Sequence, residues 1–185
     1  MTGFAKRGER EVHSGHVIST AVGTFVAPDG TEFQRDLVHH PGAVSVVPLL
    51  DDGDVVLVRQ YRAPLDTDLL EIPAGKRDVE GEDVRVTAHR ELEEEIGMVA
   101  GQLELLAEFY NSPGFSDEHS FVFLARELRE TAIARDGIEE QSMQIERVAL
   151  DDVPRLIRAG EIVDAKSIIG LMMARDRLAR PPSPS

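Results

Sequence analysis

The feature of this sequence that most restricts its fold is a glutamate-rich segment between Gly75 and Met98 with the periodicity of an amphipathic helix. An apolar residue recurs at every fourth position, which would place one apolar stripe against a core. The stripe consists of Val84, Ala88, Leu92 and Ile96. Gly97 follows directly, where a helix can end in a left-handed cap. We therefore expect a helix over residues 84–96 that packs on a larger apolar layer.

The same segment carries a dense group of carboxylates away from the apolar stripe. Glu91 and Glu95 are an i,i+4 pair, and Glu94 lies between their directions, so the three side chains share one flank of the helix. Like-charge repulsion disfavours this density unless a cation lies among the carboxylates. A hard divalent metal ion is one candidate, because it prefers oxygen ligands. The alternative is a solvated helix face with ordinary salt bridges, such as one between Arg90 and Glu94.

The complete pattern of this segment resembles the Nudix box of the Nudix hydrolases, G-x5-E-x7-R-E-U-x-E-E-x-G-U with U an apolar residue. The matching residues are Gly75, Glu82, Arg90, Glu91, Leu92, Glu94, Glu95, Gly97 and Met98. One departure exists, since six residues instead of five separate Gly75 from Glu82. The additional residue falls in the loop before the helix, so we expect a bulge there that leaves the helical carboxylates in place.

Motifs outside the box resemble the ADP-ribose pyrophosphatase branch of this family. They are Arg59–Arg62, Leu70–Gly75 and Ser112–Glu118. Pro113 stands sixteen positions after Gly97, where this branch carries a marker proline. The resemblance extends from about Gly15 to Leu171. It implies an enzyme that hydrolyses ADP-ribose to AMP and ribose 5-phosphate. The implied cofactor is Mg²⁺, for which Mn²⁺ could substitute.

The resemblance also implies which residues hold the metal ion. Glu91 and Glu95 are the expected principal ligands, and Glu94 and the carbonyl oxygen of Ala74 are the expected third and fourth ligands. Mg²⁺ at this place would neutralise the diphosphate and acidify the attacking water. Glu82 is expected to orient Arg90 instead of binding metal.

A general base is expected from a loop that follows the sheet. Glu140 is the favoured residue, either as the base that takes a proton from water or as a late-arriving metal ligand, and Glu139 is the alternative. A mobile loop is a suitable carrier because its closure over substrate could complete the site. The other interpretation is a pair of solvated glutamates in a polar loop.

Cationic side chains are needed for an anionic substrate. Arg62 matches a family arginine that grips the diphosphate, and Arg59 is either its partner or a residue that faces water. Arg35 resembles a residue that one subunit of dimeric relatives contributes across the subunit interface. Glu71 would either hydrogen-bond adenine or ribose, or form a cross-strand ion pair. The residues expected near the terminal ribose are Phe115, Asp117 and Glu118.

Composition limits the partners of this chain. A net charge of −14 argues against sequence-independent binding to nucleic acid or to an anionic membrane, since both need a basic surface. Cysteine is absent, so there is no disulfide, thiol nucleophile or thiolate metal site. The N-terminal residues lack the apolar core of a signal peptide, and no run approaches membrane-spanning length. We therefore expect a cytoplasmic protein.

The order of the expected elements is that of an α/β protein. Strands are expected over residues 16–25, 31–39, 43–50, 55–60, 103–110, 120–125 and 143–149, and further helices over residues 151–159 and 164–178. Residues 129–142 are expected to form a loop with a helical turn. This order favours a Nudix-type α/β/α sandwich with a mixed sheet and an N-terminal antiparallel strand region. The expected parts are a homodimer-forming strand region over 1–42, a Nudix domain over 43–178 and a disordered tail over 179–185.

Two alternative functions remain open. The substrate could be another nucleoside diphosphate sugar, such as ADP-glucose or GDP-mannose, or an oxidised nucleoside diphosphate. The chain could also be a non-catalytic Nudix domain that senses a nucleotide. The intact set of box glutamates argues against this second alternative.

Overall fold

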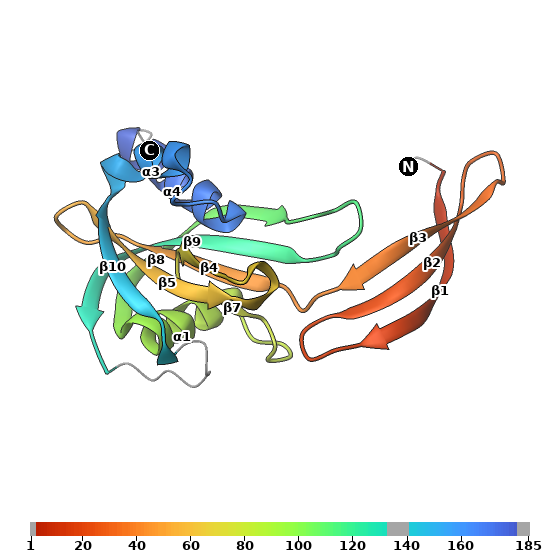
Figure 1. The fold of residues 1–185 in the computed structure, drawn as a ribbon, viewed down its shortest axis with the longest axis horizontal. Coiled ribbons are helices and arrows are strands. Elements are labelled where there is room, and N and C mark those ends of the chain that lie inside the picture. The colour runs from red at the N-terminus through yellow and green to blue at the C-terminus, as the bar shows by residue number, and fades with distance from the viewer. Residues whose placement is uncertain (1–2, 133–140, 181–185) are drawn as a thin grey trace. The chain divides into compact units, whose positions relative to one another are not determined.

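The computed structural model describes residues 3–132 and 141–180, which form two compact units (Figure 1). The first unit contains Met1–Gly42 and Phe109–Ser120, and the second contains Ala43–Glu108 and Phe121–Ser185. The Nudix-box segment lies entirely in the second unit.

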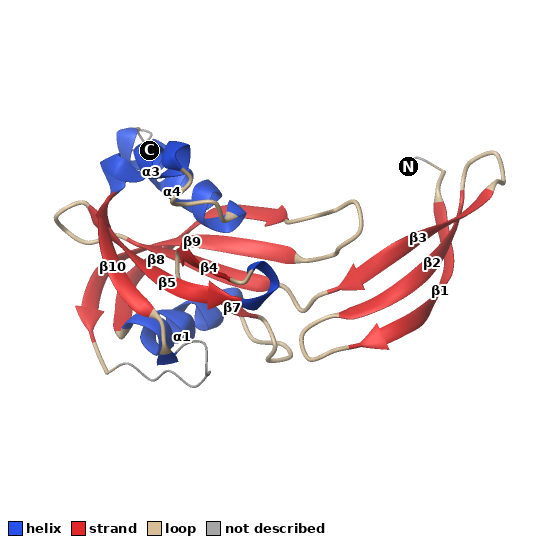
Figure 2. Ribbon diagram, viewed as in Figure 1, coloured by secondary structure: helices blue, strands red, loops and turns tan. Residues whose placement is uncertain are grey.

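The first unit is built on an antiparallel sheet in the order β1-β2-β3 (Figure 2). Its strands are β1 Ala5–Ser14, β2 Ser19–Val26 and β3 Glu32–His39. The sequence predicts β2 and β3 to within a few residues but does not predict β1. Every residue of β1 is exposed, so this strand has no buried face that would produce an apolar alternation. It is held by its backbone pairing with β2.

The second unit contains two further sheets and the helices. The three-stranded sheet has the order β10-β5-β6, and the four-stranded sheet has the order β7-β4-β9-β8. The strands are β4 Ala43–Pro48, β5 Asp54–Arg62, β6 Thr67–Glu71, β7 Ala74–Lys76, β8 Met98–Tyr110, β9 His119–Glu130 and β10 Gln144–Ala149. The helices are α1 Val84–Ile96, α3 Val153–Ala159 and α4 Ala165–Ala179, with 3-10 turns η1 Ala63–Leu65 and η2 Leu150–Asp152.

Strand β4 lies between two helical layers, and its side chains alternate between them. Val44 and Val46 belong to the buried cluster that includes the apolar stripe of α1. Val47 faces α4, where a Cβ added at Gly170 would lie 3.1 Å from the Val47 side chain. Glycine at position 170 therefore lets α4 approach the sheet closely. The predicted α/β/α sandwich with a mixed sheet is confirmed, with α1 and α4 on opposite faces (Figure 2).

The boundaries around the box helix follow the sequence signals closely. Gly97 ends α1 with φ at 63°, and its N–H bonds to the carbonyl of Glu93. The chain enters β8 at once, so this strand begins five residues before the predicted residue 103. Strand β9 continues to Glu130, so the prediction of a loop from residue 129 is wrong at its start. None of the described helices is long and apolar enough to cross a membrane.

Candidate functional site

Two of the three carboxylates predicted as metal ligands, Glu91 and Glu95, are buried on the inner flank of α1. Glu91 and Glu95 are 6% and 3% exposed, whereas Glu93 on the same helix faces solvent. The alternative of a fully solvated helix face therefore does not hold for Glu91 and Glu95. Burying a carboxylate is unfavourable unless hydrogen bonds or cations compensate it. The surroundings of both side chains show where this compensation comes from.

The segment before α1 lies directly against these two carboxylates. The Ala74 N–H donates to Glu95 Oε2 over 3.0 Å. At Gly75, an added Cβ would lie 1.8 Å from Glu91 Oε1. Any side chain at position 75 would displace the Glu91 carboxylate from its present position, which gives a physical reason for the first residue of the box. The backbone of β7 thus forms one wall of the site, and Ala74 contacts Glu95 there through its N–H.

Arg90 is the cation that balances this group of acids. Its Nη1 lies 2.7 Å from Glu91 Oε1 and 3.0 Å from Glu94 Oε2. Its Nη2 lies 3.7 Å from Glu82 Oε2. Burial opposes the charged form, but the carboxylates of Glu91, Glu94 and Glu82 outweigh it and raise the pKa of Arg90 above its ordinary value. Arg90 therefore stays charged and holds Glu91 and Glu94 together.

The lengthened loop between Gly75 and Glu82 is anchored at both ends. Arg90 Nη2 reaches the Lys76 carbonyl over 3.5 Å at the start of the loop. At its end, Glu82 Oε2 accepts a hydrogen bond of 2.7 Å from Thr87 Oγ1, and Gly81 turns the chain with φ at 78°. The extra residue is absorbed between these anchors, and Glu91 and Glu95 remain on adjacent turns of α1. The expected bulge stays a prediction.

The donor atoms of the site fit a hard divalent cation. Within residues 3–132 and 141–180, no three acidic or histidine side chains are grouped closely enough to hold a metal ion. The chemistry of the donors nevertheless suits one, because Glu91 and Glu95 are buried carboxylates on adjacent turns. The absence of a side chain at Gly75 allows the Glu91 carboxylate oxygens to lie against the backbone. The roles of Glu91, Glu95, Glu94 and the Ala74 carbonyl as metal ligands remain predictions.

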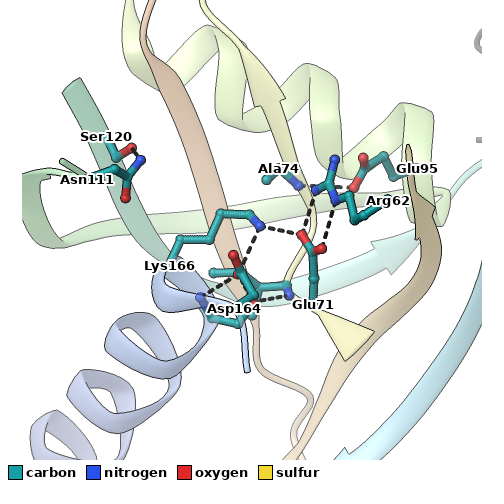
Figure 3. A network of polar contacts seen from close by, with 10 residues as sticks. Arg62, Glu71, Ala74, Glu95, Asn111, Ser120, Asp164 and Lys166 are labelled. Carbon is teal, nitrogen blue, oxygen red and sulfur yellow. Dashed lines mark hydrogen bonds and ion pairs between the residues drawn. The ribbon is translucent and has the colours of Figure 1, made fainter. Parts of the chain in front are cut away.

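A second polar network lies beside this wall and is shown in Figure 3. Arg62, at the end of β5, makes a bidentate contact with Glu71 of β6, with N–O distances of 2.7 and 2.5 Å. Glu71 is 1% exposed and also accepts from Lys166 Nζ. The Glu71 carboxylate raises the pKa of Arg62, and Asp164 and Glu95 contribute to the same shift. Of the two predicted roles of Glu71, the structure shows an ion pair between neighbouring strands.

The start of α4 completes this network. Asp164 caps the helix and accepts from Lys166 Nζ over 2.8 Å and from the Ser167 backbone N–H over 3.0 Å. Ser167 Oγ donates to Asp164 over 2.6 Å and accepts from the Ile72 N–H over 2.9 Å. Burial disfavours the Asp164 carboxylate, but Lys166 and Ser167 outweigh it and lower its pKa. Helix α4 therefore fixes the strand end that leads to Ala74.

Arg59 has a different partner from Arg62. Its Nε donates to Glu146 Oε1 over 2.5 Å across the β5–β10 pair. This contact raises the pKa of Arg59. The two arginines of the predicted motif therefore bind separate carboxylates, and Arg59 remains only a predicted partner in substrate binding.

The remaining predicted substrate residues belong to the first unit. Arg35 lies over the ring of Phe33 at 4.7 Å. Phe115 is exposed, and its carbonyl accepts from the Val38 N–H over 2.8 Å. The Glu118 carbonyl accepts from the Asn111 N–H over 3.2 Å. The roles of these residues in substrate binding stay predictions.

Asp117 has a partner that the sequence does not reveal. Its Oδ2 lies 2.5 Å from His39 Nδ1, and its Oδ1 accepts from the His40 N–H over 2.9 Å. The other ring nitrogen of His39 lies 3.1 Å from Glu9 Oε2. Contacts with Asp117 and then with Glu9 raise the pKa of His39. These three side chains tie β1, β3 and the loop before β9 together within the first unit.

The two candidates for the general base, Glu139 and Glu140, lie outside the described residues. Sequence reasoning also missed the residues around Glu71. Lys166, Asp164 and Ser167 are about 95 positions away from Glu71 and Ile72, so no local pattern connects them. Only the capping signal of Asp164 before an apolar helix was available in the sequence.

Comparison with known proteins adds an independent finding. The NUDIX domain model matches residues 39–168. The chain is 41% identical over 159 residues to the ADP-ribose pyrophosphatase of Bacillus subtilis (strain 168), which covers 86% of this chain and 85% of that protein. It is 38% identical over 161 residues to the methanol dehydrogenase activator of Bacillus methanolicus, covering 87% and 86%. A crystal structure of an ADP compounds hydrolase has the same fold, with a TM-score of 0.84, 21% identity and coverage of 95% and 94%.

Proposed function

Since the chain belongs to the NUDIX family and is a Nudix hydrolase, we propose that it cleaves the pyrophosphate bond of ADP-ribose to give AMP and ribose 5-phosphate. The observation that carries this proposal is the pair of buried carboxylates, Glu91 and Glu95, held against the backbone at Ala74 and Gly75. The name of the Bacillus subtilis relative supports the choice of substrate.

The proposed cofactor is Mg²⁺, with Mn²⁺ as a substitute. Its proposed ligands are Glu91 and Glu95, together with Glu94 and the Ala74 carbonyl. When bound, the ion supplies neutralisation of the diphosphate charge and a lower pKa for a coordinated water. Arg90 keeps Glu91 and Glu94 oriented toward one another.

The chain's own residues supply the remaining functions. Glu140 is proposed to take the proton from the attacking water, with Glu139 as its alternative. Arg62 is proposed to bind the diphosphate, since its side chain is 35% exposed beside the buried Glu71. Arg59 and Arg35 are proposed to assist, and Phe115, Asp117 and Glu118 to line the ribose end. We also propose a cytoplasmic homodimer formed through the N-terminal strands.

The substrate assignment is tested with a panel of nucleotides. The protein is incubated with Mg²⁺ and ADP-ribose, ADP-glucose, GDP-mannose or FAD, and the products are separated by chromatography. We expect ADP-ribose to have the highest kcat/KM and to give AMP and ribose 5-phosphate. If another nucleotide is cleaved equally fast, the substrate assignment fails and the alternative substrate class is favoured. Absence of cleavage with every member would contradict the enzymatic proposal.

The metal site is tested with Glu95→Gln and a matched control, Glu93→Gln, on the exposed face of the same helix. A cation that binds only the folded protein raises Tm by mass action. We expect millimolar MgCl₂ to raise the Tm of the unchanged protein and of Glu93→Gln but not that of Glu95→Gln. Activity should fall about 100-fold in Glu95→Gln, as for loss of one strong electrostatic contact at a reacting centre. An equal Tm response of both variants would remove Glu95 from the ligand set.

A further inference from the structure

Glu71 is a buried carboxylate with two cations. It is 1% exposed and contacts both Arg62 and Lys166, which approach from β5 and α4 respectively. Lys166 also pairs with Asp164 over 2.8 Å, so two cations balance two carboxylates here, and Lys166 bridges both carboxylates. The two cations also differ in exposure, because the Arg62 side chain is 35% exposed and the Lys166 side chain is 13% exposed.

The difference in exposure indicates that Arg62 and Lys166 have different roles. Lys166 is largely enclosed, so it can form ion pairs only with carboxylates inside the network. Arg62 has an open side, and the field of Glu95 at the candidate metal site acts on it. Figure 3 shows the Arg62 guanidinium between Glu71 and the Ala74–Glu95 contact. Arg62 is therefore the cation of this network that can serve a ligand from outside.

We propose that Lys166 is the permanent counter-ion of Glu71 and thereby allows the Arg62 guanidinium to leave Glu71 and bind the substrate diphosphate. This inference rests on the proposed function, in which Arg62 binds that group. Lys166 acts through Arg62 and is thus a positioning residue. The exchange replaces one bidentate carboxylate contact of Arg62 with a bidentate phosphate contact.

Electrostatics explains why such an exchange needs Lys166. If Arg62 turned away with no other cation present, Glu71 would be left as an unpaired buried charge, which is strongly unfavourable. With Lys166 in place, the carboxylate keeps an ion pair. Asp164 does not depend on Lys166 alone, because it also accepts hydrogen bonds from the backbone N–H and the hydroxyl of Ser167. The N-terminal end of α4 adds further positive potential at Asp164.

The test is the variant Lys166→Met, assayed with ADP-ribose and Mg²⁺. This change leaves the Arg62–Glu71 pair intact and neutral, so the fold should be kept, which a thermal melt verifies. We expect KM to rise about tenfold with kcat within about twofold, because Arg62 stays locked on Glu71 and ground-state binding is lost. Lys166→Arg should have a KM close to that of the unchanged protein, because it keeps a cation at this position.

The matched control is Arg177→Met, which removes one positive charge from the same helix. Arg177 pairs with Glu104 over 2.6 Å and has no contact with Glu71 among the described residues. We expect its KM to remain unchanged. An equal rise of KM in Arg177→Met and Lys166→Met would show a general charge effect and would overturn the proposal.

A double-mutant cycle gives the sharpest result. In a Glu71→Gln background no carboxylate holds Arg62, so adding Lys166→Met should change KM by less than about twofold. A tenfold effect of Lys166→Met in that background would overturn the exchange. Arg62→Met separates the two proposals. If it raises KM while Lys166→Met does not, the exchange fails and the diphosphate role of Arg62 stands. If neither variant changes KM, both assignments fail.

Discussion

Gly75 shows how a single residue can determine the geometry of the candidate site. The absence of a side chain there permits contact between the β7 backbone and the Glu91 carboxylate, since an added Cβ would lie 1.8 Å from Glu91 Oε1. The neighbouring N–H of Ala74 holds Glu95 in the same way. The first glycine of the box is therefore needed for close packing and not for an unusual backbone angle.

We predict that Gly75→Ala displaces the Glu91 carboxylate and lowers kcat/KM about 100-fold, the effect of a displacement of about 1 Å at a reacting centre. Gly8→Ala is the control, because its added Cβ would meet nothing within 4 Å and Gly8 does not have a positive φ. Steady-state kinetics on both variants provides the measurement. Full activity of Gly75→Ala would mean that Glu91 does not need its present position.

At this scale the sequence predicts the candidate site unevenly. Glu91, Glu95, Arg90 and Ala74 lie together as expected, because they are close in the sequence and helical periodicity sets their directions. Lys166 and the His39–Asp117 contact could not be found in this way. Each joins positions about 80 to 95 residues apart, and only the tertiary fold brings them together.

At the scale of elements, α4 does more than cover the sheet. Its first turn holds the end of β6 through Ser167, whose hydroxyl accepts from the Ile72 N–H and donates to Asp164. The segment that follows, Pro73–Gly75, forms the wall of the candidate metal site. A helix near the C-terminal end of the chain thus fixes a loop on which the box carboxylates depend.

We predict that Ser167→Ala lowers the free energy of unfolding by about 1–3 kcal/mol, because it leaves the buried Ile72 N–H without its acceptor. Ser45→Ala is the matched control. Ser45 is also fully buried, but its hydroxyl has no hydrogen-bond partner among the described residues. We expect it to change stability by less than about 0.5 kcal/mol. Urea denaturation of both variants gives the comparison, and equal losses would show that the Ser167 contact has no special weight.

The elements that sequence patterns predict well are those with one buried face. The stripe of α1 belongs to this group, whereas β4 is buried on both faces and is recognised as a short, nearly continuous apolar run. Strand β1 has no buried residue, and β6 and β7 are too short to show a period. These strands are defined by backbone pairing with β2, β5 and β4. Pairing leaves little trace in side-chain patterns, so local sequence reasoning does not detect it.

At the scale of the whole molecule, the dominant quantity is the net charge of −14. Several cations of this chain contact more than one acid, and His39 is an example that depends on pH. It lies between Asp117 and Glu9, and Glu9 also pairs with Lys6 over 2.7 Å. Since both ring nitrogens face carboxylates, the protonated imidazole is the form that satisfies them both.

We predict that His39 stabilises the protein in acid and less so as the pH rises. Its folded-state pKa is raised above the ordinary histidine value of 6.5, so its contribution is complete below about pH 6.5 and is lost as pH rises through the raised pKa. The difference in Tm between the unchanged protein and His39→Gln should therefore shrink between pH 6 and 9. A difference that is constant or grows with pH would contradict this assignment.

The loop between Lys76 and Glu82 offers a practical consequence for protein engineering. Arg90 and Thr87 fasten its two ends, while Val79 and Gly81 project into solvent between those fastenings. The entropic cost of closing a loop rises only slowly with its length, so a longer loop here would destabilise the fold little. A fluorescent reporter inserted after Val79 would thus sit close to the acidic centre without altering the length of the helix that carries it.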